Sequence, residues 1–587
     1  MAILSILSSY QSRLPTILVI SAHKDIQYQP INTKYTQVST TSDLRNSTRK
    51  ITSTTSDQLI KHDSSNKPYE SFFCNHINYI NIAEEKQDAK HERLVKQVRR
   101  LMAKLVNDDD TFEDLILVDA LQRLAIDYHF EDIINIILIK RYRQFNNTEI
   151  FVHHNLYEVS LTFRMLRQNG FHVSADPFMK FKGNDGNFED KWNKDIVGLM
   201  ALHEASHLRI KGEMILDEAE RYSYRLLNDL MNYVDADQAE MIRNTLENPY
   251  HKTMPLFDIK KCIKYFDGTI LQELAELNFS MMQSIRQKEL DQISRWWKDL
   301  GLGQELTRAR DQPLKWYLWS MAALTDPTLS QQRILLTKTI SLIYIMDDIF
   351  DVYGTIEELT IFTEAINRWD IKANEQLPYY MKSTFKAVFD ITNEIANKVH
   401  EQHGFNPISF LQNSWATLCN AFLVEAKWFA SGHILNAKEY LENGIVTSGV
   451  EVVLVHCFFL LGDGKTREQA GLINDNRDII SSVATILRLW DDLGSAQDES
   501  QDGNDGSYIM YIQNEHEGCS VDVAREHVMN LISDTWKRLN KECLSSNPFS
   551  ATFITAANNI ARMVPLMYSY GDNGSLPLLD DNIKFML

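Results

Sequence analysis

The chain has 587 residues, of which 44% are hydrophobic and 10% aromatic, so it can bury cores large enough for two domains. Its formal net charge of −19 argues against nucleic acid or an anionic membrane surface as a partner. The six cysteines lack paired spacing, which is typical of a reducing compartment and speaks against a disulfide framework or a CxxC metal site.

Residues 1–60 differ in composition from the rest of the chain. They are rich in Ser and Thr, hold three acidic residues (Asp25, Asp43 and Asp57) and carry six basic ones. N-terminal segments of this basic, hydroxyl-rich kind are typical of organelle transit peptides. The composition therefore predicts a transit peptide, with a mature chain that starts between about residue 50 and residue 80. A disordered polar tail is the alternative interpretation.

From about residue 85 onward the sequence predicts helices. Apolar residues recur at three and four positions in segments such as 90–106, 115–138 and 522–544, and no convincing period-two strand appears. The stretch NPYHKTMPLF, residues 248–257, suits a domain boundary because its prolines interrupt helices. The expected fold class is all-α, with one helical domain at 85–255 and another at 256–587. No apolar run has the length that a bilayer span needs.

Within the first helical domain, His203, Glu204 and His207 spell HExxH on a predicted helix. This spacing puts two imidazoles on one face with a carboxylate between them, as a zinc peptidase requires. The following stretch offers acids but no recognisable third ligand. Packing of Leu202 and Leu208 into a core is the simpler interpretation.

The first acidic cluster lies in the segment 337–354, TKTISLIYIMDDIFDVYG. On an α-helix, residues four apart lie about 40° apart in azimuth, so Asp347 and Asp351 share a face, with Asp348 beside them. The surrounding helix is apolar nearly all round. Because buried carboxylates need a metal or a charged partner, a merely solvated acidic face does not suit this segment.

A second acidic cluster follows the apolar segment VATILRLW, residues 483–490. By the same helical spacing, Asp491, Ser495 and Glu499 form one stripe of oxygen donors. Sparse oxygen ligands suit Mg²⁺, which keeps several waters and is usually completed by substrate phosphate oxygens. The two clusters together predict a site for metal ions and a diphosphate.

Several longer stretches resemble plant class I terpene synthases. They are LTFRMLRQNGFHVSADPFMKFK, LTRARDQPLKWYLWSMAALTDP, DDIFDVYGTIEELTIFTEAINRWD and LRLWDDLGSAQDESQDGNDGSY, and the resemblance covers nearly everything after about residue 85. It implies an N-terminal, α-barrel-like helical domain without chemistry of its own. It also implies a C-terminal class I terpenoid synthase bundle that binds three Mg²⁺, with Mn²⁺ as an alternative, and a prenyl diphosphate.

The resemblance also assigns roles to individual residues. Asp347 and Asp351 match the aspartate-rich metal ligands, with Asp348 in the same motif. The second metal motif matches at all three of its ligand positions, which are Asp491, Ser495 and Glu499.

Other positions match the substrate-binding parts of the family. Arg488 resembles the arginine that grips diphosphate, and Arg310 matches the first arginine of an upstream RDR loop. Trp319 matches an aromatic residue at the cavity floor, where its ring face can stabilise a cation; packing in the core is the competing interpretation. Gly449 suits a helix break that points carbonyls into the cavity.

Three departures from the family pattern bear on the product. The second arginine of the RDR loop is replaced by Gln312, the tandem-arginine motif is absent, and the C-terminal loop reads MYSYGDNGSLPLL around Tyr568 and Asp572. This combination resembles the linalool and nerolidol synthases. It predicts early capture of the cation by water, which gives linalool from geranyl diphosphate or nerolidol from farnesyl diphosphate.

Alternatives remain open at this point. They are an enzyme making cyclic or olefinic monoterpenes or sesquiterpenes, a chain-elongating prenyltransferase, and an inactive helical scaffold. The transit-like leader favours geranyl diphosphate as substrate in plastids, with the cytosol as the alternative location. The family resemblance implies a monomer.

Overall fold

The computed structural model describes residues 69–106, 112–146, 154–371, 376–433, 435–495, 507–516, 518–545 and 548–568, without the side chains of 69–85 and 495. The predicted leader lies outside these residues. The described part of the chain is helical and has no strand, apart from a single bridge between Lys182 and Phe188. The prediction of an all-α fold is confirmed.

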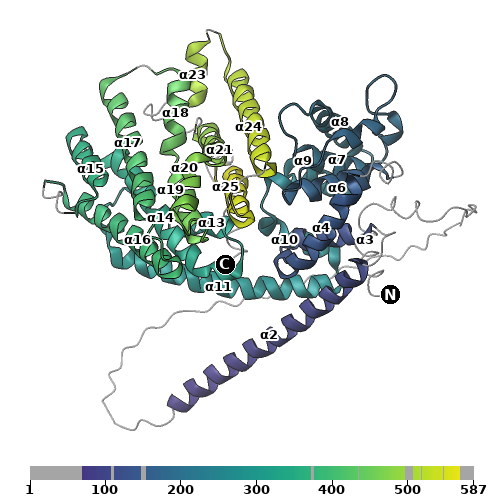
Figure 1. Cartoon of the computed structure of the whole chain (residues 1–587), viewed down its shortest axis with the longest axis horizontal. Coiled ribbons are helices and arrows are strands. Elements are labelled where there is room, and N and C mark those ends of the chain that lie inside the picture. Colours follow the sequence, from purple (N-terminus) through teal and green to yellow (C-terminus); the bar gives the residue numbers. More distant parts are fainter. Residues whose placement is uncertain are drawn as a thin grey trace, which may run out of the picture.

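The helices form two sets that lie side by side (Figure 1). The first set comprises α2 (Tyr69–Val106), α3 (Glu113–Arg123), η2 (Asp127–Phe130), α4 (Glu131–Phe145), α6 (Leu156–Gln168), η3 (Asp176–Phe181), η4 (Asp190–Trp192), α7 (Ile196–Ser206), α8 (Met214–Leu230), α9 (Ala236–Glu247), η5 (Tyr250–Lys252), α10 (Pro255–Ile263) and η6 (Lys264–Phe266).

The second set contains the segments that carry both acidic clusters. It comprises α11 (Ile270–Leu300), α12 (Leu302–Glu305), α13 (Pro313–Ala323), η7 (Pro327–Leu329), α14 (Ser330–Asp348), η8 (Ile349–Tyr353), α15 (Ile356–Arg368), α16 (Tyr379–His403), α17 (Ile408–Ser431), α18 (Ala437–Thr447), α19 (Val450–Leu460), α20 (Arg467–Asp475), α21 (Asp478–Ser495), α23 (Tyr508–Glu515), α24 (Val521–Leu544) and α25 (Ala551–Tyr568).

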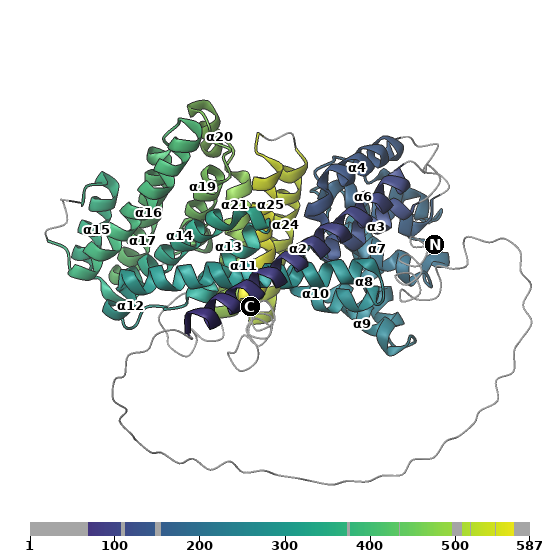
Figure 2. The same ribbon diagram turned by 90° about the horizontal axis from the view of Figure 1, so that it is seen from below.

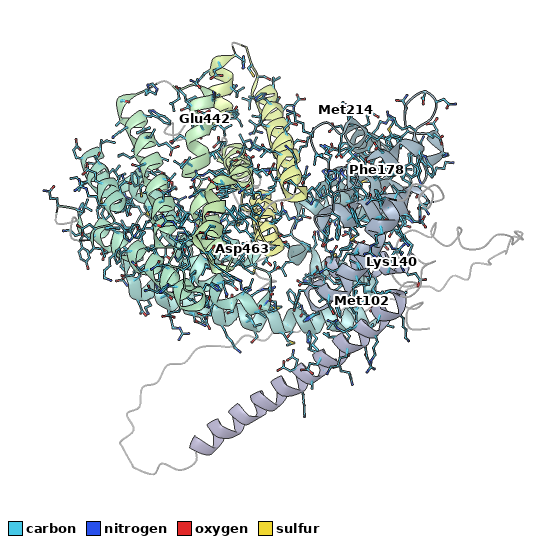
Figure 3. The ribbon with its side chains drawn as sticks, viewed as in Figure 1. Met102, Lys140, Phe178, Met214, Glu442 and Asp463 are labelled. Carbon is cyan, nitrogen blue, oxygen red and sulfur yellow. The ribbon has the colours of Figure 1, made fainter. Side chains whose placement is uncertain are left out.

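The apolar periodicity of the sequence explains how the first set packs. In α2, Leu94, Val98 and Met102 are spaced by four residues and are all buried, so they form one face against the N-terminal core. Met102 and Phe178 lie inside this set, whereas Met214 is 61% exposed at its periphery (Figure 3). Burial of such a stripe, more than intrinsic propensity, stabilises a helix in a protein.

Helix α11 belongs to both halves of the molecule. Its first turns place Leu271 and Leu274 in the N-terminal core, and its last turns place Ile293 and Trp297 in the C-terminal core. Figure 2 shows this helix running beneath both sets. The helix begins at the Thr269 cap, whose side chain accepts the Gln272 N–H. The domain limits at 85–255 and 256–587 stay a prediction.

Hydrogen bonds near α24 and α25 join the two sets. The Asn540 side-chain amide donates to the carbonyl oxygens of His207 and Arg209, at 3.0 and 2.9 Å. Arg562 Nε donates to the His251 carbonyl oxygen at 2.7 Å. Because α24 and α25 also pack on α21, these bonds fix the helix of the second acidic cluster against the N-terminal half.

The segment Ala437–Leu460 is apolar and long enough, by length and composition alone, to cross a membrane. The sequence prediction of no such run is therefore wrong for this segment. Its most apolar stretch is 67% buried inside the molecule, and the backbone breaks into α18 and α19 around Gly449. A buried core segment passes the same test of length and hydropathy.

Candidate active site

Helix α14 carries the first acidic pair at its C-terminal end. The helix is buried nearly all round, as its apolar sequence predicts. The Asp347 side chain is 31% exposed, whereas that of Asp348 is 8% exposed. Two neighbouring carboxylates therefore lie in different environments, one open and one closed.

Arg310 binds both members of this pair. Its Nε donates to Asp348 Oδ1 at 2.7 Å, its backbone N–H donates to Asp348 Oδ2 at 2.8 Å, and its guanidinium also pairs with Asp347. Burial by itself would lower the pKa of Arg310, but the two carboxylates raise this pKa above its ordinary value. The guanidinium also lies over the Tyr344 ring, with Cζ 4.9 Å from the centroid. Asp348 thus holds the Arg310 loop and side chain in place.

The helix changes its winding where the first acidic cluster ends. Residues Ile349–Tyr353 form a π-helical turn, closed by the Gly354 N–H donating to the Ile349 carbonyl oxygen at 2.9 Å. Asp351 lies on this turn and is exposed. The expectation that Asp347 and Asp351 lie on one continuous α-helix is therefore wrong. Single π turns are rare and occur frequently at functional sites.

Helix α21 carries the second acidic pair, and it repeats the arrangement of the first. Arg488 donates through Nη2 to Asp491 Oδ2 at 2.6 Å and through Nε to Asp492 Oδ1 at 2.9 Å. Asp492 is 1% exposed and also accepts from the Tyr440 hydroxyl and the Tyr508 backbone N–H. The sequence interpretation did not assign Asp492 a role. The repeated DD dipeptide was the available signal.

The two partly exposed carboxylates are Asp347 and Asp491. Burial raises the pKa of the Asp491 carboxyl, Arg488 opposes this, and the charges of Asp492 and Asp347 raise the pKa further. Asp347 and Asp491 come from different helices and are far apart in the sequence. The Asp347 charge acts on Asp491 across this separation, and the convergence of the two clusters on one metal site stays a prediction.

The possible metal ligands of the two clusters whose side chains the structure describes are carboxylate oxygens. Ser495 is described through its backbone alone, as the last residue of α21, and Glu499 lies outside the described residues. Within those residues, no three His, Cys, Asp or Glu side chains are grouped closely enough to hold a metal ion. Arg310 and Arg488 instead neutralise the carboxylates. Oxygen donors that are few and still partly open fit a divalent cation that takes further ligands from a substrate.

Aromatic residues adjoin Arg310. Trp319 Nε1 donates to the Tyr344 hydroxyl at 3.1 Å, and the Trp319 ring centroid lies 6.4 Å from that of Tyr568. Trp319 is 6% exposed. Burial raises the pKa of the Tyr344 hydroxyl to about 12, so this group is a neutral hydrogen-bonding phenol. Tyr344 and Tyr568 were not predicted to adjoin Trp319, because their contact depends on how α13, α14 and α25 pack.

The loop after Arg310 contains one replaced arginine and one unpredicted lysine. Gln312 is exposed and precedes α13 as its N-cap. Lys315, in the first turn of α13, is half-buried. Burial and Arg310 lower the pKa of Lys315, while the Asp491 charge raises it. The Lys315 charge on α13 is therefore influenced by Arg310 and by Asp491 of the second cluster.

Two glycines shape the wall opposite α14. Gly449 has a positive φ of 71° and separates α18 from α19, so the predicted helix break is confirmed. A Cβ on Gly449 would lie 2.6 Å from Ile343 Cγ2. A Cβ on Gly444 would lie 2.7 Å from Arg488 Cδ, so the missing side chain leaves room for the arginine that binds Asp491.

The HExxH motif lies in the other half of the molecule. His203 Nε2 and His207 Nε2 lie 3.2 Å apart and both residues are buried. Burial lowers the pKa of His203 to about 4. Glu204 Oε2 accepts the Tyr250 backbone N–H at 2.7 Å. The Glu204 carboxylate is thus used to hold η5, which favours the structural interpretation of this motif.

The sequence also matches known protein families. Residues 298–538 match the metal binding domain of the terpene synthase family, and residues 65–246 match the terpene synthase N-terminal domain. A probable terpene synthase from Ricinus communis is 52% identical, over 84% of this chain and 87% of the relative.

Relatives with named activities have different products. An (E)-nerolidol synthase from Cannabis sativa is 49% identical over 81% of this chain and 88% of its own. An S-(+)-linalool synthase from Arabidopsis thaliana, described as chloroplastic, is 46% identical over 85% of this chain and 88% of its own. A chloroplastic tricyclene synthase from Antirrhinum majus is 45% identical over 85% of this chain and 87% of its own.

A solved structure has the same fold. Isoprene synthase from grey poplar, in complex with three Mg²⁺ ions and dimethylallyl-S-thiolodiphosphate, superimposes with a TM-score of 0.80 at 34% identity. The match covers 85% of this chain and 96% of that chain.

Proposed function

The chain belongs to the plant terpene synthase family, and on that premise we propose that it ionises geranyl diphosphate and adds water to the allylic cation, giving linalool. Farnesyl diphosphate would give nerolidol by the same steps. The observation that supports this proposal is the pair of acidic clusters, each with a partly exposed aspartate, a buried aspartate and an arginine that binds both.

The metal ligands in this proposal come from both clusters. Asp347 and Asp351 would hold divalent metal from one side, and Asp491, Ser495 and Glu499 from the other. The metal-binding family match and the Mg²⁺ ions of the isoprene synthase complex support a divalent cation, for which we propose three Mg²⁺. When bound, such cations stabilise the negative charge that develops on a departing diphosphate.

The arginines bind and orient the leaving group. Asp348 and Asp492 hold Arg310 and Arg488 from the buried side, so each guanidinium is already positioned beside the partly exposed aspartate of its own cluster. Lys315 would add a third cation there in place of the arginine missing at Gln312. Fixed donors aimed at developing charge need no reorganisation during the reaction.

The chemical steps conserve atoms and charge. The allylic C–O bond breaks, and its electron pair leaves with the diphosphate. A water oxygen then bonds to the tertiary end of the allylic cation and loses a proton. Trp319, with Tyr344 and Tyr568 beside it, would offer ring faces to this cation.

An acyclic alcohol is the product that we propose, and the replacement at Gln312 together with the nerolidol and linalool synthase relatives supports it. A cyclic product is the second candidate, because a tricyclene synthase is almost as similar. Relatives described as chloroplastic support location in plastids, with residues 1–60 as the transit peptide.

Product analysis tests the proposal. Chain lacking the leader is incubated with Mg²⁺ and either geranyl or farnesyl diphosphate, and products are separated by chiral gas chromatography with mass spectrometry. Linalool or nerolidol without cyclic products is expected. Cyclic products would overturn the water-capture step, and no turnover with either substrate would overturn the proposed activity.

A further inference from the structure

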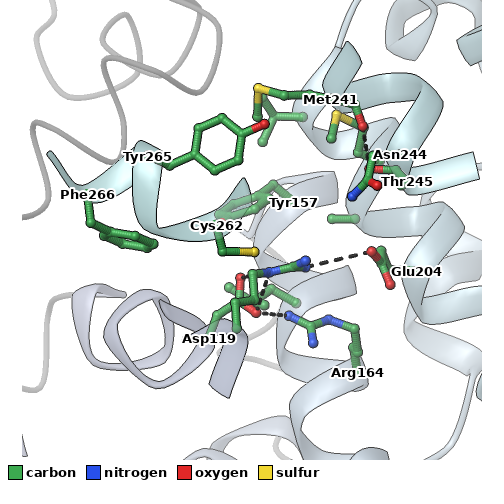
Figure 4. A pocket seen from close by; sticks show the side chains of 15 residues that line it. Asp119, Tyr157, Arg164, Glu204, Met241, Asn244, Thr245, Cys262, Tyr265 and Phe266 are labelled. Atoms are coloured by element: carbon green, nitrogen blue, oxygen red, sulfur yellow. Dashed lines mark hydrogen bonds and ion pairs between the residues drawn. The ribbon is translucent and has the colours of Figure 1, made fainter. Parts of the chain in front are cut away.

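The N-terminal half contains a cavity of about 110 Å³, separate from the acidic clusters. It is enclosed by α3, α6, α7, α9, α10 and η6, and Figure 4 shows its lining side chains. Nothing in the proposed reaction uses it. Glu204 of the HExxH motif is one of its lining residues.

The cavity has an apolar body and one charged end. Leu161, Met200 and Met241 are among the apolar side chains of its wall. In Figure 4, Phe266 lies at one end of the cavity and Glu204 at the other. Such a lining suits a molecule with an apolar body and one polar group.

The charged end contains an ion pair that a hydroxyl group can contact from the cavity side. Arg123 Nη2 lies 3.7 Å from Glu204 Oε1, which is beyond hydrogen-bond distance. Both side chains are held in place, because Arg123 Nε donates to Asp119 at 3.0 Å and Glu204 Oε2 accepts the Tyr250 N–H. A hydroxyl both accepts and donates, so it can accept from Arg123 and donate to Glu204.

The charges around this ion pair select against an ionic ligand. Arg123 and Arg164 supply two positive charges, and Asp119 and Glu204 supply two negative ones. An additional carboxylate or ammonium group would be buried without a counter-charge, which is costly. A neutral molecule keeps the balance.

The volume limits the size of the ligand. An apolar cavity of about 150 Å³ accommodates benzene, which has six heavy atoms, so 110 Å³ suits a smaller molecule of about four heavy atoms. We propose that this cavity binds a small, neutral, branched alcohol, with its hydroxyl beside the Arg123–Glu204 ion pair and its carbon atoms against Met200 and Met241. The site is independent of the proposed active site, so either assignment can fail alone.

Thermal unfolding of the full chain tests this site with three probes of similar size. They are 2-propanol, which is neutral, acetate, which is an anion, and isopropylammonium, which is a cation. Each shift of the unfolding midpoint is measured in the wild type and in Ala201→Leu, which fills the cavity from α7. General solvent effects act on both proteins and cancel in the difference.

We expect a saturable excess stabilisation of the wild type by the alcohol alone, which at ten times Kd multiplies the folding equilibrium constant by about eleven. Equal shifts in both proteins, or a larger excess with either ion, would overturn the proposal.

Two further variants test the hydroxyl contact. Glu204→Gln keeps an acceptor for the Tyr250 N–H but removes the carboxylate, and it should weaken alcohol binding about tenfold. Thr245→Val, in the same wall, should leave the affinity unchanged. Equal affinities in all three proteins would refute a hydroxyl contact with Glu204, and none of these changes should alter turnover of geranyl diphosphate.

Discussion

The region around Asp114 and the two acidic clusters both bury charged residues, but they arrange them differently. In the N-terminal half, Asp114 is fully buried and Arg141 closes on it through several hydrogen bonds. In the C-terminal half, Arg310 and Arg488 each bind one buried aspartate, Asp348 or Asp492, and a second aspartate that remains partly exposed. A fully buried pair stabilises the fold. A partly exposed carboxylate can instead bind a metal cation, and the arginine held beside it can bind a phosphate.

The largest effect is expected from breaking a fully buried pair. Asp114→Ala leaves Arg141 buried without its counter-charge, and this should lower the free energy of unfolding by about 3 to 5 kcal/mol. Denaturant titration measures the loss, and kcat of the folded protein should not change. Glu92→Ala removes an exposed pair with Lys96 and serves as the control, with a change of less than about 1 kcal/mol. If Asp114→Ala lost kcat while its stability stayed unchanged, the pair with Arg141 would not be structural and the comparison would fail.

Removing a partly exposed carboxylate should lower the activity and leave the stability of the fold unchanged. Asp347→Ala should lower kcat/KM by about two to three orders of magnitude, because a proposed metal ligand is lost while α14 keeps its apolar packing. Steady-state kinetics with geranyl diphosphate measures the loss, and circular dichroism should show unchanged helicity. Asp390→Ala, at an exposed pair on α16, is a suitable control. Activity retained by Asp347→Ala would refute the metal assignment.

The buried partner in the second cluster should have an intermediate effect. Asp492→Asn keeps an acceptor but removes the charge that holds Arg488, so kcat/KM should fall about 10-fold to 100-fold. The Mg²⁺ concentration for half-maximal activity should change less than in Asp491→Asn. If both variants shift the Mg²⁺ dependence equally, Asp492 is itself a ligand and the contrast between open and buried aspartates fails.

The sequence was sufficient to predict the helical fold and to place an acidic pair at the end of each of two apolar helices, because apolar periodicity and carboxylate spacing are local patterns. The role of Asp492 was not predictable in this way, since its partners Tyr440 and Tyr508 come from other helices. The π turn at Ile349–Tyr353 was also missed, because its sequence has the same apolar pattern as an α-helix. The positions of Arg310 and Lys315 depend on how α13 packs on α14, which no local pattern encodes.

The smallest effect on rate is expected at Gln312, because its side chain belongs to neither of the two arginine–aspartate clusters. Its side chain is exposed at the start of α13. Gln312→Arg should therefore leave the folding free energy and the ionisation step nearly unchanged, with kcat within a few-fold of the wild type, about 1 kcal/mol or less.

The same variant should change the product. The added guanidinium would hold the departed diphosphate longer beside the allylic cation and favour cyclic products. Chiral gas chromatography measures the ratio of cyclic to acyclic products, with Gln312→Lys as a test of charge without the guanidinium fork. An unchanged acyclic product would remove any causal role for this residue and would attribute product choice to the aromatic residues around Trp319.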